Sequence, residues 1–155
     1  MFIPMDKSLQ AHSRRVAILV DRFGRLLGLG MDDLAILQKG AILHDIGKTR
    51  VPECILNKPG PLSDSEWRIM RRHPEYACNI LSRFQSPNNT LVIPYCHHEW
   101  WDGSGYPRGL KGEEIPVSAR LFALTDVWDA LRSDRPYRRR WPIEKAYKYI
   151  QDQAG

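Results

Sequence analysis

The chain has 155 residues, 43% hydrophobic and 26% charged, with a net charge of +5, which is ordinary for one soluble globular domain with a real core. It holds no apolar run near the roughly 20 residues that span a bilayer, and its first residues lack the pattern of an export signal. The three cysteines have no paired spacing, so we expect a reducing, cytoplasmic setting rather than a disulfide framework.

The first 50 residues predict two helices that each carry a histidine on an apolar face. Residues with helical spacing on the first are His12, Val16, Leu19, Val20, Phe23 and Leu27. After a break at GLGMDD, a second helix begins near Asp32 or Asp33. Its apolar face consists of Leu34, Leu37 and Ala41 and brings His44 to the same side. Gly47 is a stop signal for this helix.

Residues 63–100 predict three more helices. Ser63 and Glu66 have the spacing of a capping box, and in the helix that follows Trp67 and Met70 lead to His73 in steps of three. Pro74 starts a new segment, whose apolar residues are Ala77, Ile80, Leu81 and Phe84. A fifth helix runs through residues 90–100, bent at Pro94, and carries the pair His97–His98.

A loop rich in glycine and proline follows, and two helices complete the chain. Pro116 opens a helix with a face of small and apolar residues, namely Ala119, Phe122, Ala123, Asp126 and Ala130. Pro142 opens the last helix. Because no alternating β-branched run occurs anywhere, the predicted fold class is all-α.

All five histidines of the chain fall on or at the end of an apolar helical face. A single inward histidine is more often a hydrogen-bonded core residue than a metal ligand. Burying five imidazoles without strong partners is costly, however, and a shared cluster of divalent metals would satisfy them together. Asp45 and Asp126 are the inward carboxylates that could supply negative charge.

The adjacent pair His44–Asp45 suits a two-metal cluster, since a carboxylate can bridge two cations while the neighbouring imidazole binds one of them. Two such ions clamp a phosphate and lower the pKa of a bridging water, so that hydroxide attacks at neutral pH. Lys48 lies one turn after His44 and could neutralise charge that builds on the phosphate oxygens.

Residues 132–140 hold five arginines and one aspartate, nearly the whole excess of positive charge. Guanidinium groups suit phosphate, because each can donate two parallel hydrogen bonds. The alternative is a solvated basic turn with no ligand.

The chain resembles the HD-GYP family, a branch of the HD superfamily of metal-dependent phosphohydrolases. The matching segments are HDIGK (44–48), VPECILNKPGPLSDSEW (51–67), HHEWWDGSGYPRGLKGEEIP (97–116) and DVWDALRSDRPYR (126–138). The likeness runs from His12 to Ala146. It implies a bundle of at least five core helices with the GYP loop between the fifth and sixth, and hydrolysis of cyclic di-GMP to pGpG and, in some members, GMP.

Carried over position by position, the resemblance implies a role for eleven residues. The metal ligands would be His12, His44, Asp45, His73, His97, His98 and Asp126, with Asp45 bridging. Lys48, Arg135 and Arg138 would contact substrate phosphates, and Tyr106 of the GYP loop would bind substrate and shape the site. Ser8 stands where some members have a glutamate for a third metal, so we expect two ions. Iron or manganese is favoured, with nickel, cobalt or zinc as alternatives.

The resemblance also bears on domain organisation and partners. Residues 1–155 are expected to form a single HD-GYP catalytic domain, either excised from a longer chain or a short stand-alone form, that ends before a further C-terminal helix. The expected partners are cyclic di-GMP, diguanylate cyclase (GGDEF) domains and an N-terminal regulatory domain, with no nucleic acid polymer. The alternatives are a module that senses cyclic di-GMP or docks a cyclase without cleavage, an HD-type hydrolase of another nucleotide, and a di-iron oxygenase.

Three neighbouring residues have structural interpretations. We interpret Glu99 as an outer partner that orients a ligating imidazole rather than as a general acid. Asp129 is expected to accept a hydrogen bond within its own helix, and Cys96 to be a small buried thiol rather than a ligand.

Overall fold

The computed structural model describes residues 7–84, 88–134 and 139–153, and within these ranges the chain is helical and has no strand. The longer helices are α1 (Lys7–Leu26), α2 (Met31–Leu43), α4 (Asp64–Met70), α5 (His73–Leu81), α6 (Asn88–Cys96), α7 (Val117–Arg132) and α8 (Ile143–Asp152). Short elements are η1 (Ile46–Arg50), α3 (Glu53–Leu56), η2 (Ser82–Phe84) and η3 (Gly112–Glu114). The predicted all-α fold class is therefore confirmed. None of the described helices combines the length and apolar character that a membrane crossing needs.

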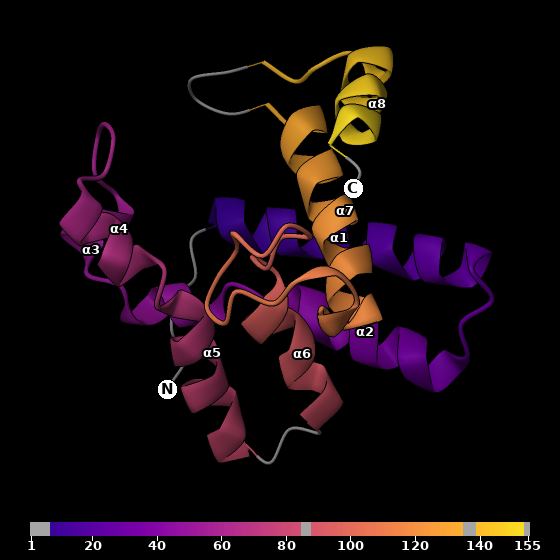
Figure 1. Ribbon diagram of the computed structural model, residues 1–155, viewed down its shortest axis with the longest axis horizontal. Coiled ribbons are helices and arrows are strands. Elements are labelled where there is room, and N and C mark those ends of the chain that lie inside the picture. The colour runs from indigo at the N-terminus through magenta and orange to yellow at the C-terminus, as the bar shows by residue number, and fades with distance from the viewer. Residues whose placement is uncertain (1–6, 85–87, 135–138, 154–155) are drawn as a thin grey trace.

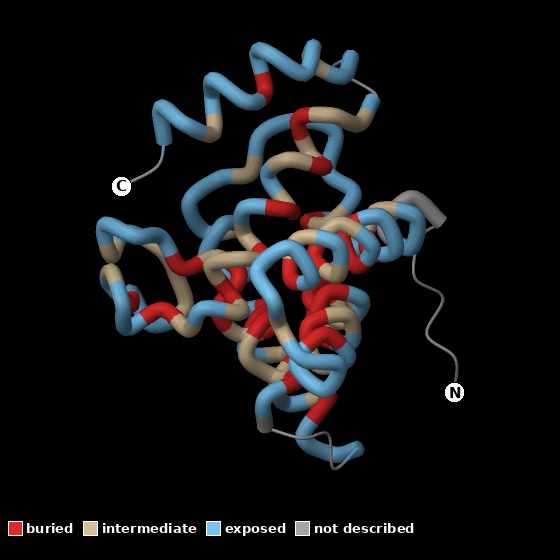
Figure 2. Tube along the Cα trace, turned by 90° about the vertical axis from the view of Figure 1, so that its right-hand side faces the viewer, coloured by how far each residue is buried: buried red, intermediate tan, exposed pale blue. Residues whose placement is uncertain are grey.

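Four helices, α1, α2, α6 and α7, build the core that supports the site. Figure 1 shows α1 and α2 running side by side, with α7 crossing them, while α5 and α6 lie on the other side of α2. The buried cluster at their junction consists of Val16, Ala17, Val20, Leu37, Ala41, Ile93 and Phe122. The buried segments concentrate at this junction, whereas α8 is exposed along most of its length and packs on α7 (Figure 2). The histidine-bearing ends of α1, α2, α5 and α6 consequently meet around α7.

The predicted capping box at the start of α4 is present. The Ser63 hydroxyl accepts a hydrogen bond from the backbone N–H of Glu66, and the Glu66 carboxylate accepts one from the backbone N–H of Ser63. The predicted apolar face of this helix is wrong, however, because α4 buries none of its residues and Trp67 is 44% exposed. The helix ends at Met70, and His73 belongs to α5. Trp67, Met70 and His73 are spaced by three residues but therefore do not lie on one helix.

Three other helix-end predictions are corrected for a similar reason. Leu27 follows the last residue of α1, and Phe84 lies in η2 beyond α5, so both side chains are exposed. The fifth predicted helix ends at Cys96, and His97 and His98 lie in the turn that follows. Past the ends of α1 and α5 helical periodicity no longer predicts burial, whereas His97 remains buried although it follows α6.

Gly47 sets how closely the segment after α2 approaches α5. A Cβ atom at this position would lie 1.9 Å from the carbonyl oxygen of His73 and 2.7 Å from the backbone nitrogen of Ala77. Backbone atoms cannot give way as flexible side chains do, so any side chain here would push η1 away from α5. Because residue 47 has no side chain, η1 packs closely on α5, and this packing places His44 and Asp45 next to His73.

Substituting Gly47 with alanine is expected to lower the free energy of unfolding by about 1–3 kcal/mol or more, as overpacking typically does. The same backbone shift should separate Asp45 from His73. Chemical denaturation measures the stability, and Gly30→Ala is the matched control, because a Cβ atom at Gly30 meets nothing within 4 Å. Equal stabilities for the two variants would contradict this account of η1 packing.

Candidate metal centre

The predicted ligands fall into two groups of three. The first group is His73, His97 and His98, from the start of α5 and the turn after α6. The second group is His12, His44 and Asp126, from α1, the end of α2 and α7. Within each group, one potential ligand atom per residue lies within 4.8 Å of the others. Each group therefore has the spacing and atom types of a metal site.

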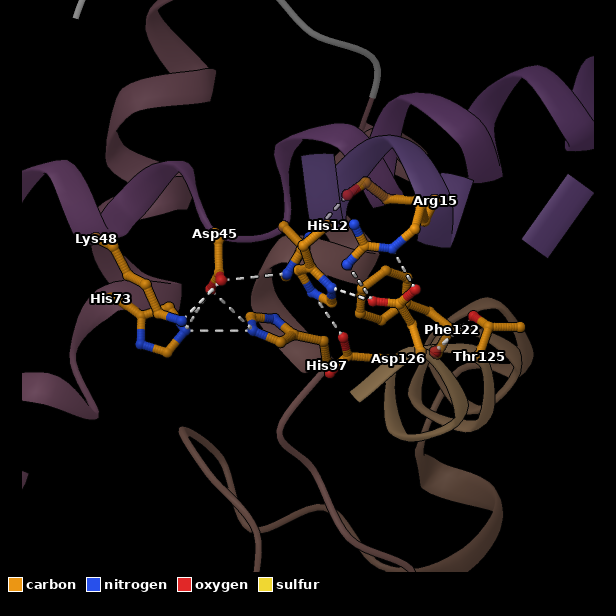
Figure 3. Close-up of polar contacts among 12 residues, drawn as sticks. His12, Arg15, Asp45, Lys48, His73, His97, Phe122, Thr125 and Asp126 are labelled. Carbon is orange, nitrogen blue, oxygen red and sulfur yellow. Dashed lines mark hydrogen bonds and ion pairs between the residues drawn. The ribbon is translucent and has the colours of Figure 1, made fainter. Parts of the chain in front are cut away.

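Asp45 lies between the two groups and faces both of them (Figure 3). Its Oδ2 is 3.3 Å from Nε2 of His44, whereas its Oδ1 is 3.5 Å from Nε2 of His73 and 3.8 Å from Nε2 of His97. Asp45 is only 6% exposed. Each carboxylate oxygen is thus directed to a different group, as a bridging ligand requires.

Backbone carbonyls fix the orientation of three of the imidazoles. The Nδ1 atom of His44 is 2.7 Å from the carbonyl oxygen of Ala41, and that of His73 is 2.9 Å from the carbonyl oxygen of Met70. Nδ1 of His97 lies 3.2 Å from the carbonyl oxygen of Ile93. A carbonyl oxygen can only accept, so each Nδ1 must carry the proton and donate it. Each Nε2 is then left with a lone pair that faces the other ligands, the arrangement in which histidine binds metals.

Two contacts in the centre fit a bound cation. Nε2 of His73 and Nε2 of His97 are 3.2 Å apart, and because both rings donate through Nδ1, two lone pairs face each other at this distance. Oδ1 of Asp45 is buried, and no described residue forms a hydrogen bond with it. Buried acceptors without a donor are costly, and a positive ion among them would satisfy all three. The residues present thus fit divalent metal ions.

The electrostatics of the first group and of Asp45 keep the ligand atoms deprotonated near neutral pH. Burial lowers the pKa of His73 to about 4 and that of His98 to about 2, and it also lowers the pKa of His97. Burial alone would raise the pKa of Asp45, but His44 and Lys48 beside it outweigh burial and hold this pKa well below its usual range. Neutral imidazoles and an ionised carboxylate are the forms that bind a metal.

A carboxylate outside the second group, Asp129, contacts one of its ligands, and sequence reasoning missed this role. Nδ1 of His12 lies 2.8 Å from Oδ2 of Asp129, and Arg15 donates to both oxygens of Asp129 at 2.7 and 2.9 Å. Burial lowers the pKa of His12, but the hydrogen bonds with Asp126 and Asp129 outweigh it and raise this pKa to about 9. Asp129 was expected to accept within its own helix, and instead it accepts from α1. The sequence signal for this role was the position of Asp129 one helical turn after Asp126, which puts both carboxylates on the same side of α7.

The interpretation of Glu99 is also corrected. Its carboxylate accepts hydrogen bonds from the backbone N–H groups of Arg108 and Leu110, both at 2.8 Å, and does not contact an imidazole. Glu99 therefore fixes the loop that follows it rather than a ligand directly. The prediction for Cys96 is confirmed, since its thiol is buried and burial raises its pKa to about 11.

The four residues predicted to contact substrate have different outcomes. Lys48 lies at the centre, where its Nζ donates to Oδ2 of Asp45 at 2.7 Å. The ring of Tyr106 stacks on His98 with 4.6 Å between centroids. Arg135 and Arg138 lie outside the described residues.

The fold and this centre together define a helical domain with two adjacent histidine-containing ligand groups and a shared aspartate. The family whose description is "HD domain" matches residues 4–155, and this chain belongs to that family. HD domains bind divalent metals, and the two ligand groups found here could hold them. The predicted resemblance to HD-GYP phosphohydrolases is thereby confirmed.

Two curated relatives are cyclic dinucleotide phosphodiesterases. A cyclic di-GMP phosphodiesterase of Thermotoga maritima is 43% identical over 97% of this chain and 41% of its own length. The 3'3'-cGAMP-specific phosphodiesterase 2 of Vibrio cholerae is 41% identical over 94% of this chain and 28% of its own length. The chain thus spans between about a quarter and two fifths of the length of these relatives.

A solved structure shares the fold. The HDGYP protein Bd1817 of Bdellovibrio bacteriovorus superposes with a TM-score of 0.73 at 23% identity, covering 93% of this chain and 46% of its own. This likeness confirms the helical architecture that places the two ligand groups side by side.

Proposed function

We propose that this domain is a metal-dependent phosphodiesterase that hydrolyses cyclic di-GMP to the linear dinucleotide pGpG, and in a second step to GMP. The single observation that carries the proposal is Asp45, which directs one oxygen to each ligand group at 3.3 to 3.8 Å. The names of the relatives supply the substrate class. Hydrolysis breaks one phosphorus–oxygen ester bond, adds a water oxygen to phosphorus and leaves a free ribose hydroxyl.

Seven residues would hold the ions in this proposal. One ion would be held by His73, His97 and His98, the other by His12, His44 and Asp126, and Asp45 would contact both. Two divalent ions supply a clamp for the scissile phosphate and lower the pKa of the attacking water. The ligand types suit iron or manganese, and also nickel, cobalt or zinc. Ser8 occupies the position of a third-metal ligand in some members, which supports a two-ion site.

Lys48 is the proposed phosphate contact of this chain. Its side chain is about a quarter exposed, and its ammonium group reaches Asp45 at the edge of the centre. A phosphate oxygen that enters the centre would compete with Asp45 for this ammonium and would draw it away from the carboxylate. There it would stabilise the negative charge that builds on the phosphate in the transition state.

Recognition of the rest of the substrate is assigned to residues outside the ligand groups. Arg135 and Arg138 are the proposed contacts for the second phosphate, since guanidinium groups can orient it with two parallel hydrogen bonds. Binding of a diguanylate cyclase domain stays a prediction.

A second candidate substrate is 3'3'-cGAMP, because one of the relatives is named for it. It differs from cyclic di-GMP in one base, and in this proposal the metal ions would contact the phosphate and not the bases. The presence of every predicted ligand in the structure favours either reaction over a non-catalytic sensing module.

The test is incubation of the metal-loaded protein with each cyclic dinucleotide, followed by chromatographic separation of the products. We expect pGpG to form from cyclic di-GMP and its formation to stop when a chelator removes the metals. Faster turnover of 3'3'-cGAMP would assign that substrate instead. Binding of cyclic di-GMP without any product from a fully metal-loaded sample would identify a sensing module.

A further inference from the structure

His98 differs from the other four histidines in how its ring is held. The rings of His44, His73 and His97 donate to backbone carbonyls, and the ring of His12 contacts Asp129. Among the described residues, none forms a hydrogen bond with the His98 ring, although His98 belongs to the first ligand group. Something other than a hydrogen bond must therefore orient this imidazole.

Aromatic packing supplies the orientation. The Tyr106 ring lies nearly parallel to that of His98, with an interplanar angle of 24° and 4.6 Å between centroids. The His97 ring contacts His98 at 4.1 Å between centroids, with a tilt of 42°. A flat ring against one face restricts the tilt of an imidazole about its side-chain bonds, because a different ring plane would collide with it. The position of Tyr106 consequently fixes the plane in which the ring nitrogens of His98 lie.

Two backbone contacts fix Tyr106 relative to His98. The backbone N–H of Tyr106 donates to the carbonyl oxygen of His98 at 3.0 Å. At the preceding residue, Gly105, a Cβ atom would lie 2.3 Å from the backbone nitrogen of Trp100 and 2.5 Å from the carbonyl oxygen of His98. The loop can fold back onto the histidine pair at this distance only because residue 105 is glycine.

Glu99 closes the same loop from the other side. It directly follows His98, is only 4% exposed, and its two carboxylate oxygens accept from the backbone N–H groups of Arg108 and Leu110. A buried carboxylate with two such bonds is a strong and specific clamp. It ties the residue after His98 to the chain just beyond Tyr106, so the loop carries Tyr106 back over the imidazole.

We propose that Glu99 and Tyr106 are positioning residues for a metal ligand: Glu99 closes the loop, and the Tyr106 ring orients His98. This inference rests on the proposed metal centre, and it assigns to the Tyr106 ring a function that does not require contact with substrate. It also explains why a buried carboxylate follows the histidine pair without contacting either imidazole. The ring, and not the hydroxyl group, carries this role.

The test is a metal titration of folded, metal-stripped protein, with each ion followed as a separate binding step. Tyr106→Ala should weaken one of the two steps by roughly 10- to 100-fold, as loss of an outer partner of a ligating histidine does, and leave the other unchanged. Tyr106→Phe retains the ring and should bind both ions like the parent. Glu99→Gln should weaken the same step as Tyr106→Ala, because its amide group can accept from only one of the two N–H groups.

Glu114→Gln is the matched control. Glu114 lies after the same loop and accepts from the backbone N–H of Lys111, but it is exposed. It should leave both steps unchanged. If Tyr106→Ala does not fold, as judged by circular dichroism, Tyr106→Leu replaces it, since leucine retains apolar bulk without a flat face.

The outcomes separate the two proposals. If the parent protein binds two ions and Tyr106→Ala, or Tyr106→Leu in its place, binds them equally well, the ring does not position His98. Weakened binding in Tyr106→Phe would also overturn it, by assigning the effect to the hydroxyl group. If the parent protein binds no metal, the proposal of a metal centre is itself wrong.

Discussion

Replacing Asp45 with alanine is expected to remove most of the bound metal and to lower turnover of cyclic di-GMP by roughly 10³-fold or more. Asp45 lies between both ligand groups, so its loss would deprive each ion of a ligand at once. It also leaves Lys48 without its partner at 2.7 Å, which adds an unpaired positive charge that repels cations. Metal quantitation by elemental analysis and steady-state kinetics measure the two effects.

The control for this variant is Asp152→Ala, which removes an exposed aspartate of α8 that pairs with Lys148. It makes the same change of charge on the surface and should leave metal content and turnover at the parent level. Full metal loading of Asp45→Ala would show that the two groups bind their ions independently, against the bridging role assigned here.

The second large effect is expected for Lys48→Ala, which should lower turnover by roughly 10²-fold while the metals are retained. Lys48 carries positive charge next to Asp45, so its removal takes away a competitor of the metals rather than a ligand. The lost activity comes from the missing charge stabilisation on the phosphate. Elemental analysis and kinetics on the same metal-loaded sample separate binding from chemistry.

Lys58→Ala is the matched lysine variant, because Lys58 pairs with Glu66 on an exposed part of the chain. It should show parent turnover. A Lys48→Ala enzyme that also turns over at the parent rate would reduce Lys48 to a helix-end residue with no contact to the substrate.

Local periodicity was sufficient to predict the helices that hold most ligands. His12 precedes and His44 follows apolar residues at helical spacing, and α1 and α2 bury those faces against each other. The same reasoning gave a wrong face for Trp67, because a helix ended between it and His73. The resemblance to HD-GYP proteins then pointed to the same seven ligands and added Tyr106 of the GYP loop.

Contacts between segments that are far apart in the chain could not be predicted from the sequence. Asp129 contacts His12 across 117 residues of chain, and Glu99 contacts Leu110 across a loop without periodicity. Both are carboxylates whose partners depend on how helices and loops pack, and no local pattern encodes that. The close approach of Gly105 to His98 is of the same kind, since its cause is the backbone of another segment.

Anomalous X-ray diffraction from crystals of the metal-loaded protein tests the central claim most directly. We expect two peaks, one beside His73, His97 and His98 and the other beside His12, His44 and Asp126, with one oxygen of Asp45 at each. A single peak, or two ions of which Asp45 contacts only one, would contradict the bridged two-metal centre.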